Sequence, residues 1–221
     1  MIVALDIETI PNADMIDKLP DPKIRANLKD PDKIETAKRE GRQKQVDTMA
    51  LDPLTARVAC YSLVDGNEDH IETIPEINDI AEINLIHSLM RMLSDETVRI
   101  VTWNGISFDL PMIYKRAMIL GVSPANFGAP PLTTWTKRYN IDRHFDLMKI
   151  WTDWKGGSDG YAKLDTVAGM VIGANKTDFD VMKIAELLLT EEGRNQVGQY
   201  CLQDTRLTWE LWKRFSGTLF A

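Results

Sequence analysis

The feature that most limits how this chain can fold is a pair of acidic residues, Asp6 and Glu8, inside an otherwise apolar segment at residues 1–9. Apolar residues occupy both parities of this segment, which predicts a central strand covered on both faces. Side chains alternate along a strand, so the two carboxylates point the same way, roughly 7 Å apart along the backbone. The apolar flanks argue against a solvated edge strand, where such a pair would be commonplace.

Three further side chains with chemical capacity lie far away in the sequence. Asp109 follows a short apolar strand predicted at residues 98–103, and strand ends are where loops carry chemistry. Asp109 also precedes a helix predicted at residues 110–120, which it can cap. Tyr200 and Asp204 are four residues apart in a predicted C-terminal helix, so they share one face of it.

Four carboxylates that converge on one spot repel each other and are costly to remove from water, so a fold that collects them needs compensating charge. Divalent cations supply this charge most simply, because hard cations prefer carboxylate oxygens. The natural inference is a two-metal phosphodiesterase. For Tyr200 the alternative is an ordinary aromatic residue of the core.

The three segments together resemble the DEDD superfamily of 3′ to 5′ exonucleases. The first motif is Asp-x-Glu-Thr at residues 6–9, the second is Asn-x-x-x-Phe-Asp at 104–109, and the third is Tyr-x-x-x-Asp at 200–204. Histidine-type members carry a histidine five residues before the last aspartate. Gln199 occupies that position here, so the chain resembles the tyrosine type.

A further stretch, residues 161–168 with Gly173 and Lys176 beyond it, is similar to a segment of the proofreading domains of family B DNA polymerases. The resemblance therefore covers nearly the whole chain, except roughly residues 12–55. It implies an α/β protein with a ribonuclease H-like fold, in which helices flank a mixed central sheet of about five strands. It also implies a setting such as proofreading or DNA repair.

The same resemblance implies two Mg²⁺ or Mn²⁺ ions roughly 4 Å apart at the last phosphodiester of a 3′ end, one activating water and one stabilising the leaving 3′ oxygen. Asp6 would bridge both ions. Glu8 and Asp204 would complete the first, and Asp109 would serve the second, directly or through water. Tyr200 would orient the attacking water, since a phenol whose ordinary pKa is ~10 is a poor base at neutral pH.

The resemblance also implies four contacts with the substrate. Main-chain groups at Thr9 and Ile10 would meet the terminal nucleotide. Asn104 and Phe108 would contact its neighbour or wedge it apart from the end.

The other segments complete an α/β pattern. Apolar periodicity and turn residues predict strands at 57–64, 70–74 and 144–146, and helices at 80–93, 164–172 and about 193–215. Asp146 is the main rival acid, and we expect it to cap a helix that starts at Leu147. On the last helix, four residues are predicted on a different side from Tyr200 and Asp204: Val197, Cys201, Thr208 and Trp212.

Length and composition favour a single exonuclease domain over residues 1–221, with 44% hydrophobic residues and a helical basic insertion at about 12–55. Within the insertion, residues 18–44 hold nine Lys or Arg and five Asp or Glu, a local charge of +4. We hypothesise that the insertion is a mobile helical arm, including residues 31–49, that helps to hold the strand being digested. The alternative is a solvated amphipathic helix with ordinary mixed charge. Neutralising four of its cations should weaken substrate binding: Lys38, Arg39, Arg42 and Lys44.

The net charge of −7 argues against tight non-specific binding to long duplexes, although two bound divalent ions would change it to −3. Cys60 and Cys201 form no Cys-x-x-Cys pair, which favours a reducing cytosol. The sequence contains no run of 18 apolar residues, so we expect no spanning helix and no membrane partner.

Trp151 and Trp154 precede a glycine-rich run at residues 156–160, which predicts a flexible loop. Two nearby indoles could stack on unpaired bases. The alternative is that these side chains plug the edge of the core.

Three functions follow from this pattern. The leading one is a metal-dependent 3′ to 5′ exonuclease that trims single-stranded or mismatched DNA ends. The second is a ribonuclease or oligoribonuclease of the same fold, which differs in how a 2′-hydroxyl is received. The third is a non-catalytic scaffold that binds nucleic acid, whose signature would be a lost carboxylate. The acidic set is complete in this chain.

Overall fold

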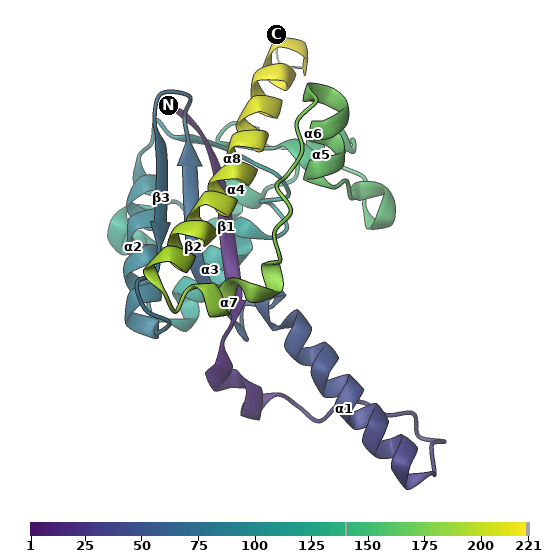
Figure 1. The fold of residues 1–221 in the computed structure, drawn as a ribbon. Coiled ribbons are helices and arrows are strands. Elements are labelled where there is room, and N and C mark those ends of the chain that lie inside the picture. Colours follow the sequence, from purple (N-terminus) through teal and green to yellow (C-terminus); the bar gives the residue numbers. More distant parts are fainter. Residues whose placement is uncertain (140, 220–221) are drawn as a thin grey trace. The chain divides into compact units, whose positions relative to one another are not determined.

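A computed structural model describes residues 1–139 and 141–219 and shows an α/β protein built on one mixed sheet (Figure 1). The sheet has five strands in the order β3-β2-β1-β4-β5. Strand β1 pairs in parallel with β4, β4 pairs in parallel with β5, and β2 and β3 form an antiparallel hairpin. The strands are β1 (Ile2–Pro11), β2 (Ala56–Val64), β3 (Asp69–Thr73), β4 (Arg99–Thr102) and β5 (His144–Asp146). The predicted fold class and all five predicted strands are confirmed.

Helices lie on both faces of the sheet, with α8 across one face and α2 on the other (Figure 1). The α-helices are α1 (Pro31–Thr48), α2 (Asp79–Ser94), α3 (Asp109–Ile119), α4 (Leu132–Thr136), α5 (Leu147–Trp151), α6 (Leu164–Ile172), α7 (Ile184–Leu187) and α8 (Glu191–Leu219). Short 3-10 helices are η1 (Ala13–Lys18), η2 (Met49–Leu51), η3 (Pro124–Phe127), η4 (Gly157–Gly160) and η5 (Val181–Lys183). Of the described helices, none is long and apolar enough to cross a bilayer.

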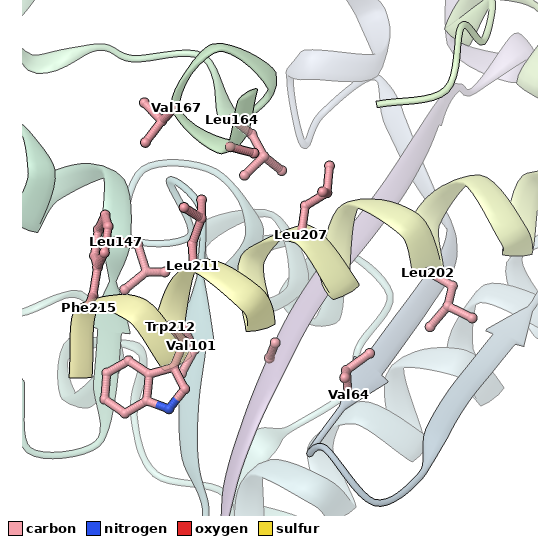
Figure 2. Packing of buried hydrophobic residues seen from close by; sticks show 12 residues of the cluster. Val64, Val101, Leu147, Leu164, Val167, Leu202, Leu207, Leu211, Trp212 and Phe215 are labelled. Carbon is pink, nitrogen blue, oxygen red and sulfur yellow. The ribbon is translucent and has the colours of Figure 1, made fainter. Parts of the chain in front are cut away.

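A buried apolar cluster fixes α8 and α6 against the sheet, as Figure 2 shows. Leu211 and Trp212 from α8 meet Val101 of β4, while Leu164 and Val167 join them from α6. Trp212 also packs against Phe145, with ring centroids 4.5 Å apart. Because burial of large apolar side chains is the main source of stability, this cluster holds the helix that carries Tyr200 and Asp204 at a fixed height over the strands.

The chain divides into two compact units, Met1–Glu8 with Val58–Ala221, and Thr9–Arg57. The second unit contains the predicted arm. Its helix α1 starts with Pro31 and is capped by Asp30, whose carboxylate accepts from the Asp32 N–H at 3.1 Å. An extended segment packs on α1 where Gly41 meets Pro22, since a Cβ at Gly41 would lie 2.6 Å from the proline Cβ.

Two local predictions need correction, and a third is confirmed. Asp109 is the first residue of α3 and Phe108 precedes it as the cap, so the capping role predicted for Asp109 is wrong. Trp151 ends α5 and stacks on Phe215 at 5.7 Å, so it belongs to a helix rather than to the predicted flexible loop. Asp146 does cap α5, as predicted.

Candidate active site

Strand β1 carries the first two acidic side chains at its carboxyl-terminal half. Burial raises the pKa of Asp6 well above its ordinary value, and the negative charges of Asp109, Glu8 and Asp204 raise it further. Burial also raises the pKa of Glu8 well above its ordinary value, and the negative charge of Asp204 is the next largest cause of that rise. The ligand atoms of Asp6 and Glu8 lie within 4.8 Å of each other, and Asp6 and Asp204 line one cavity, so acids from separate segments lie together.

Asp109 joins this group from the first turn of α3. Its side chain is buried, and burial raises its pKa to about 7. The neighbouring charge of Asp146 raises it too, while the backbone N–H groups of Asp109 and Ile7 lower it. Ile7 stands between Asp6 and Glu8 in β1, so this backbone contact ties α3 directly to β1.

Asp204 reaches the group from the middle of α8. Burial raises its pKa, and the Lys176 ammonium and the Tyr200 hydroxyl oppose that rise. Lys176 donates to Oδ2 of Asp204 and forms an ion pair with it. The other oxygen, Oδ1, is buried and has no hydrogen-bond partner among the described residues. One of the four carboxylates is thus neutralised in part by a lysine, and the other three are not in any described ion pair.

Tyr200 lies one helical turn before Asp204. Its ring stacks on Phe179 at 4.2 Å with planes inclined by only 13°, and the Lys176 ammonium lies 5.7 Å from the ring centre. Burial raises the pKa of its phenol, as do the charges of Asp204 and Glu8. The hydroxyl therefore stays protonated at neutral pH and can donate or accept a hydrogen bond, but it cannot act as a base.

Cys201 is a neighbour of the site that sequence reasoning missed, because we expected it on a different side of α8. Its sulfur lies 3.6 Å from the Asp6 carbonyl oxygen, and the ligand atoms of Asp6, Glu8 and Cys201 are all within 4.8 Å of one another. Helix α8 packs on the sheet, so its buried side faces β1. Burial raises the pKa of the Cys201 thiol, which leaves it protonated and a poor ligand for a hard cation.

A cavity of about 330 Å³ opens beside these acids. It is lined by Asp6, Trp103, Asn104, Tyr161, Lys163, Leu164, Asp165, Lys176 and Asp204. Tyr161 is 60% exposed, and the Trp103 indole N–H donates to the Ala162 carbonyl at 2.9 Å, which holds this rim in place. The sequence had marked residues 161–168 only by resemblance. Nothing in their spacing indicated that Tyr161 and Lys163 border the acidic site.

The four expected substrate contacts have different settings. Asn104 lines the cavity and adopts a left-handed backbone, with φ of 72°. Phe108 is partly exposed just before α3. Thr9 and Ile10 belong to the second unit, where the Thr9 hydroxyl donates to the Ala50 carbonyl at 2.8 Å and Ile10 is buried. The contacts of all four with a nucleotide remain predictions.

The residues fit divalent cations. Where burial and neighbouring charges raise the pKa of a carboxyl group, a nearby cation stabilises its ionised form. Carboxylate oxygens are also the ligands that suit Mg²⁺ and Mn²⁺. The buried Oδ1 of Asp204 is an acceptor that a cation could satisfy.

A sequence model described as a predicted 3′-5′ exonuclease related to the exonuclease domain of PolB matches residues 51–219. The chain belongs to this family. A family B DNA polymerase from Pyrobaculum calidifontis superimposes over 97% of this chain with a TM-score of 0.58 and 17% identity. At that identity the likeness concerns the fold alone.

Two relatives in sequence are also polymerases. The DNA polymerase catalytic subunit of Epstein-Barr virus (strain B95-8) is 29% identical over 171 residues, and the match covers 68% of this chain. The DNA polymerase of Thermococcus litoralis is 30% identical over 125 residues, which is 52% of this chain. The matched regions are 17% and 7% of the two polymerases, so this PolB-related exonuclease chain spans a small part of each relative's length.

Proposed function

We propose that this chain is a 3′ to 5′ exonuclease of the tyrosine type that hydrolyses phosphodiester bonds at the 3′ ends of single-stranded DNA. One observation carries the proposal: the charges of Glu8, Asp109 and Asp204 all act on Asp6, and Asp6 and Asp204 line one open cavity, in a chain that belongs to a PolB-related exonuclease family. A self-repelling acidic cluster has no structural benefit, so it favours a role that brings in positive charge.

In this proposal Asp6, Glu8, Asp109 and Asp204 hold two Mg²⁺ or Mn²⁺ ions. When bound, such ions lower the pKa of water and neutralise the charge that develops on the leaving 3′ oxygen. Each of these carboxylates belongs to a strand or a helix rather than to a loop, so it would hold the cations in a fixed position against the scissile phosphate.

Tyr200 orients the attacking water through its hydroxyl, which is held by the stack on Phe179. Lys176 pairs with Asp204, lies 5.7 Å from the centre of the Tyr200 ring and adds positive charge near the phosphate. Both groups act by position and charge.

The cavity accommodates the terminal nucleotide in this proposal. Trp103 and Tyr161 offer aromatic surface to an unpaired base, and Lys163 offers a cation to the backbone. A paired terminal base is held by its partner strand and cannot turn into the cavity, so the rim favours single strands.

The test is a digestion of matched DNA and RNA oligonucleotides labelled at the 3′ or the 5′ end, with Mg²⁺, Mn²⁺ or a chelator. Release of mononucleotides from DNA 3′ ends, lost in Asp6→Ala, is the expected result. A faster reaction on RNA would assign the ribonuclease alternative. Internal cuts would contradict exonuclease action, and no cleavage by the wild-type chain would favour the scaffold.

A further inference from the structure

Asp146, outside the set of proposed ligands, is fully buried at the end of β5 and accepts three backbone hydrogen bonds. One comes from Lys149 in its own helix at 3.1 Å. The other two come from a separate segment: the Asn104 N–H donates to Oδ1 at 3.1 Å, and the Ile106 N–H donates to Oδ2 at 2.9 Å. Each carboxylate oxygen therefore holds one end of the turn that follows β4.

This turn is strained and leads straight into the acidic site. Asn104 has a φ of 72°, a region that residues with a side chain rarely occupy and that costs free energy. The Asn104 carbonyl then accepts from the N–H groups of Ser107 and Phe108, both at 3.0 Å, and the next residue is Asp109. Such a conformation persists only where surrounding contacts enforce it.

A second set of contacts holds the turn from the side of β4 and β5. The Gly105 N–H donates to Thr102 Oγ1 at 3.0 Å, and a Cβ at Gly105 would lie 2.3 Å from that oxygen. The Thr102 hydroxyl also lies 2.8 Å from Nε2 of His144, whose Nδ1 lies 2.6 Å from the Trp135 carbonyl. Burial lowers the pKa of His144, so the ring is neutral: Nδ1–H donates to Trp135 and Nε2 accepts from Thr102.

We propose that Asp146 is a positioning residue of the nuclease centre: by holding the Asn104 and Ile106 amides it sets where Asn104 faces the cavity and where Asp109 faces the cations. The inference rests on the proposed function. Asp146 touches neither substrate nor cation in it. Its negative charge also lies close enough to Asp109 to raise the pKa of that residue, which is consistent with the short path between them.

The test compares Asp146→Asn with the wild type in three measurements: the Kd for Mn²⁺ by titration calorimetry, the Tm without metal, and kcat and KM on a single-stranded DNA. The amide replaces one acceptor by a donor that faces a backbone N–H. We expect Mn²⁺ affinity to fall about 10–100-fold, as is usual for groups that orient metal ligands, and kcat to fall by a similar factor.

Two further variants separate positioning from mere stability. Asn78→Ala removes the cap of α2, where the side chain accepts from the Ala81 N–H at 2.8 Å, far in sequence from the turn. It should lower Tm but keep the wild-type Kd for Mn²⁺. Asp146→Ser keeps a hydroxyl that can cap α5 but cannot reach both turn amides, so it should also lower Mn²⁺ affinity.

The proposal is overturned if folded Asp146→Asn binds Mn²⁺ and turns over DNA as the wild type does while Tm falls. If that variant does not fold, wild-type Kd and kcat in Asp146→Ser overturn it equally. The outcome is separate from that of the proposed function, since a wild-type chain that binds Mn²⁺ without cleaving DNA would refute the activity and still report on positioning.

Discussion

The charge of Asp6 is disfavoured in the site without a cation, because burial and three neighbouring acids oppose it. Replacement by Asn keeps its shape and removes one of four repelling charges. We predict that Asp6→Asn lowers nucleotide release by more than about 100-fold, beyond the usual cost of losing a group that only orients a ligand. In the absence of metal its Tm should equal or exceed that of the wild type, and added Mn²⁺ should raise it less.

The control is Glu96→Gln, which removes an exposed acid far from the site and should leave both readouts unchanged. A metal-free Tm for Asp6→Asn several degrees below the wild type would show that the carboxylate stabilises the fold by itself, contrary to the repulsion argument.

Asp109 makes the metal-free protein sensitive to pH. Its folded pKa of about 7 lies above its ordinary value of 3.8, so the folded state binds the proton more tightly than the unfolded chain does. The corresponding stability is complete below about pH 3.8 and is lost as the pH rises through 7. We predict that metal-free stability falls over this range and that Mn²⁺ affinity rises over it, because the cation competes with the proton.

Denaturant unfolding and Mn²⁺ titrations between pH 5 and 8 would measure both trends. In Asp109→Asn, the part of each pH trend that the titration of Asp109 causes should disappear. A wild-type protein whose metal-free stability rises steadily to pH 8 would contradict the assignment.

At the scale of elements, the approach of α8 to β3 decides the height of Tyr200 and Asp204. Gly198 lies where a Cβ would come within 2.8 Å of Ile71 Cγ2 and 3.3 Å of Thr73 Oγ1. We predict that Gly198→Ala shifts the helix and lowers kcat about tenfold or more, since small displacements of catalytic groups are costly. Activity and Tm measured together would check this.

Gly217→Ala is the matched control in the same helix. A Cβ there would meet nothing within 4 Å, so alanine should only add helix propensity, up to about 1 kcal/mol of stability. If Gly198→Ala behaves like Gly217→Ala, the packing of α8 on β3 does not constrain the site.

The elements also show what a sequence can foretell. All five strands were predictable because the apolar pattern of each strand is local, and the acidic set was predictable because its three motifs resemble those of a known nuclease superfamily. The contacts of Lys176 with Asp204 and of Asp146 with the turn at 104–106 were not, because neither a motif nor a periodic pattern links the two segments of each contact. Periodicity reports which side of an element is buried, and says nothing of its partner.

At the scale of the whole molecule, the arm remains a hypothesis whose test the structure sharpens. Arg42 donates to the Leu19 carbonyl at 3.2 Å and pairs with Asp21, so it supports the arm itself and is a poor probe of binding. Lys38, Arg39 and Lys44 are exposed. We predict that their replacement by Gln weakens single-stranded DNA binding and reduces the slope of log K against log salt by about 2.

Replacing the acidic Glu35 and Glu40 of the same helix by Gln is the control, and it should leave binding unchanged or slightly stronger. Equal affinity and salt slope for the cation variant and the wild type would leave the arm as an ordinary solvated helix. Like the arm, the cytosolic placement stays a prediction.

The ion pair of Lys176 with Asp204 also bears on how the newly made protein folds when no divalent cation is bound. Because Lys176 already balances part of the acidic charge, the chain should fold during synthesis without bound magnesium. The protein should be recoverable from cells in a chelating buffer as a folded but inactive chain, and it should gain activity when magnesium is added back.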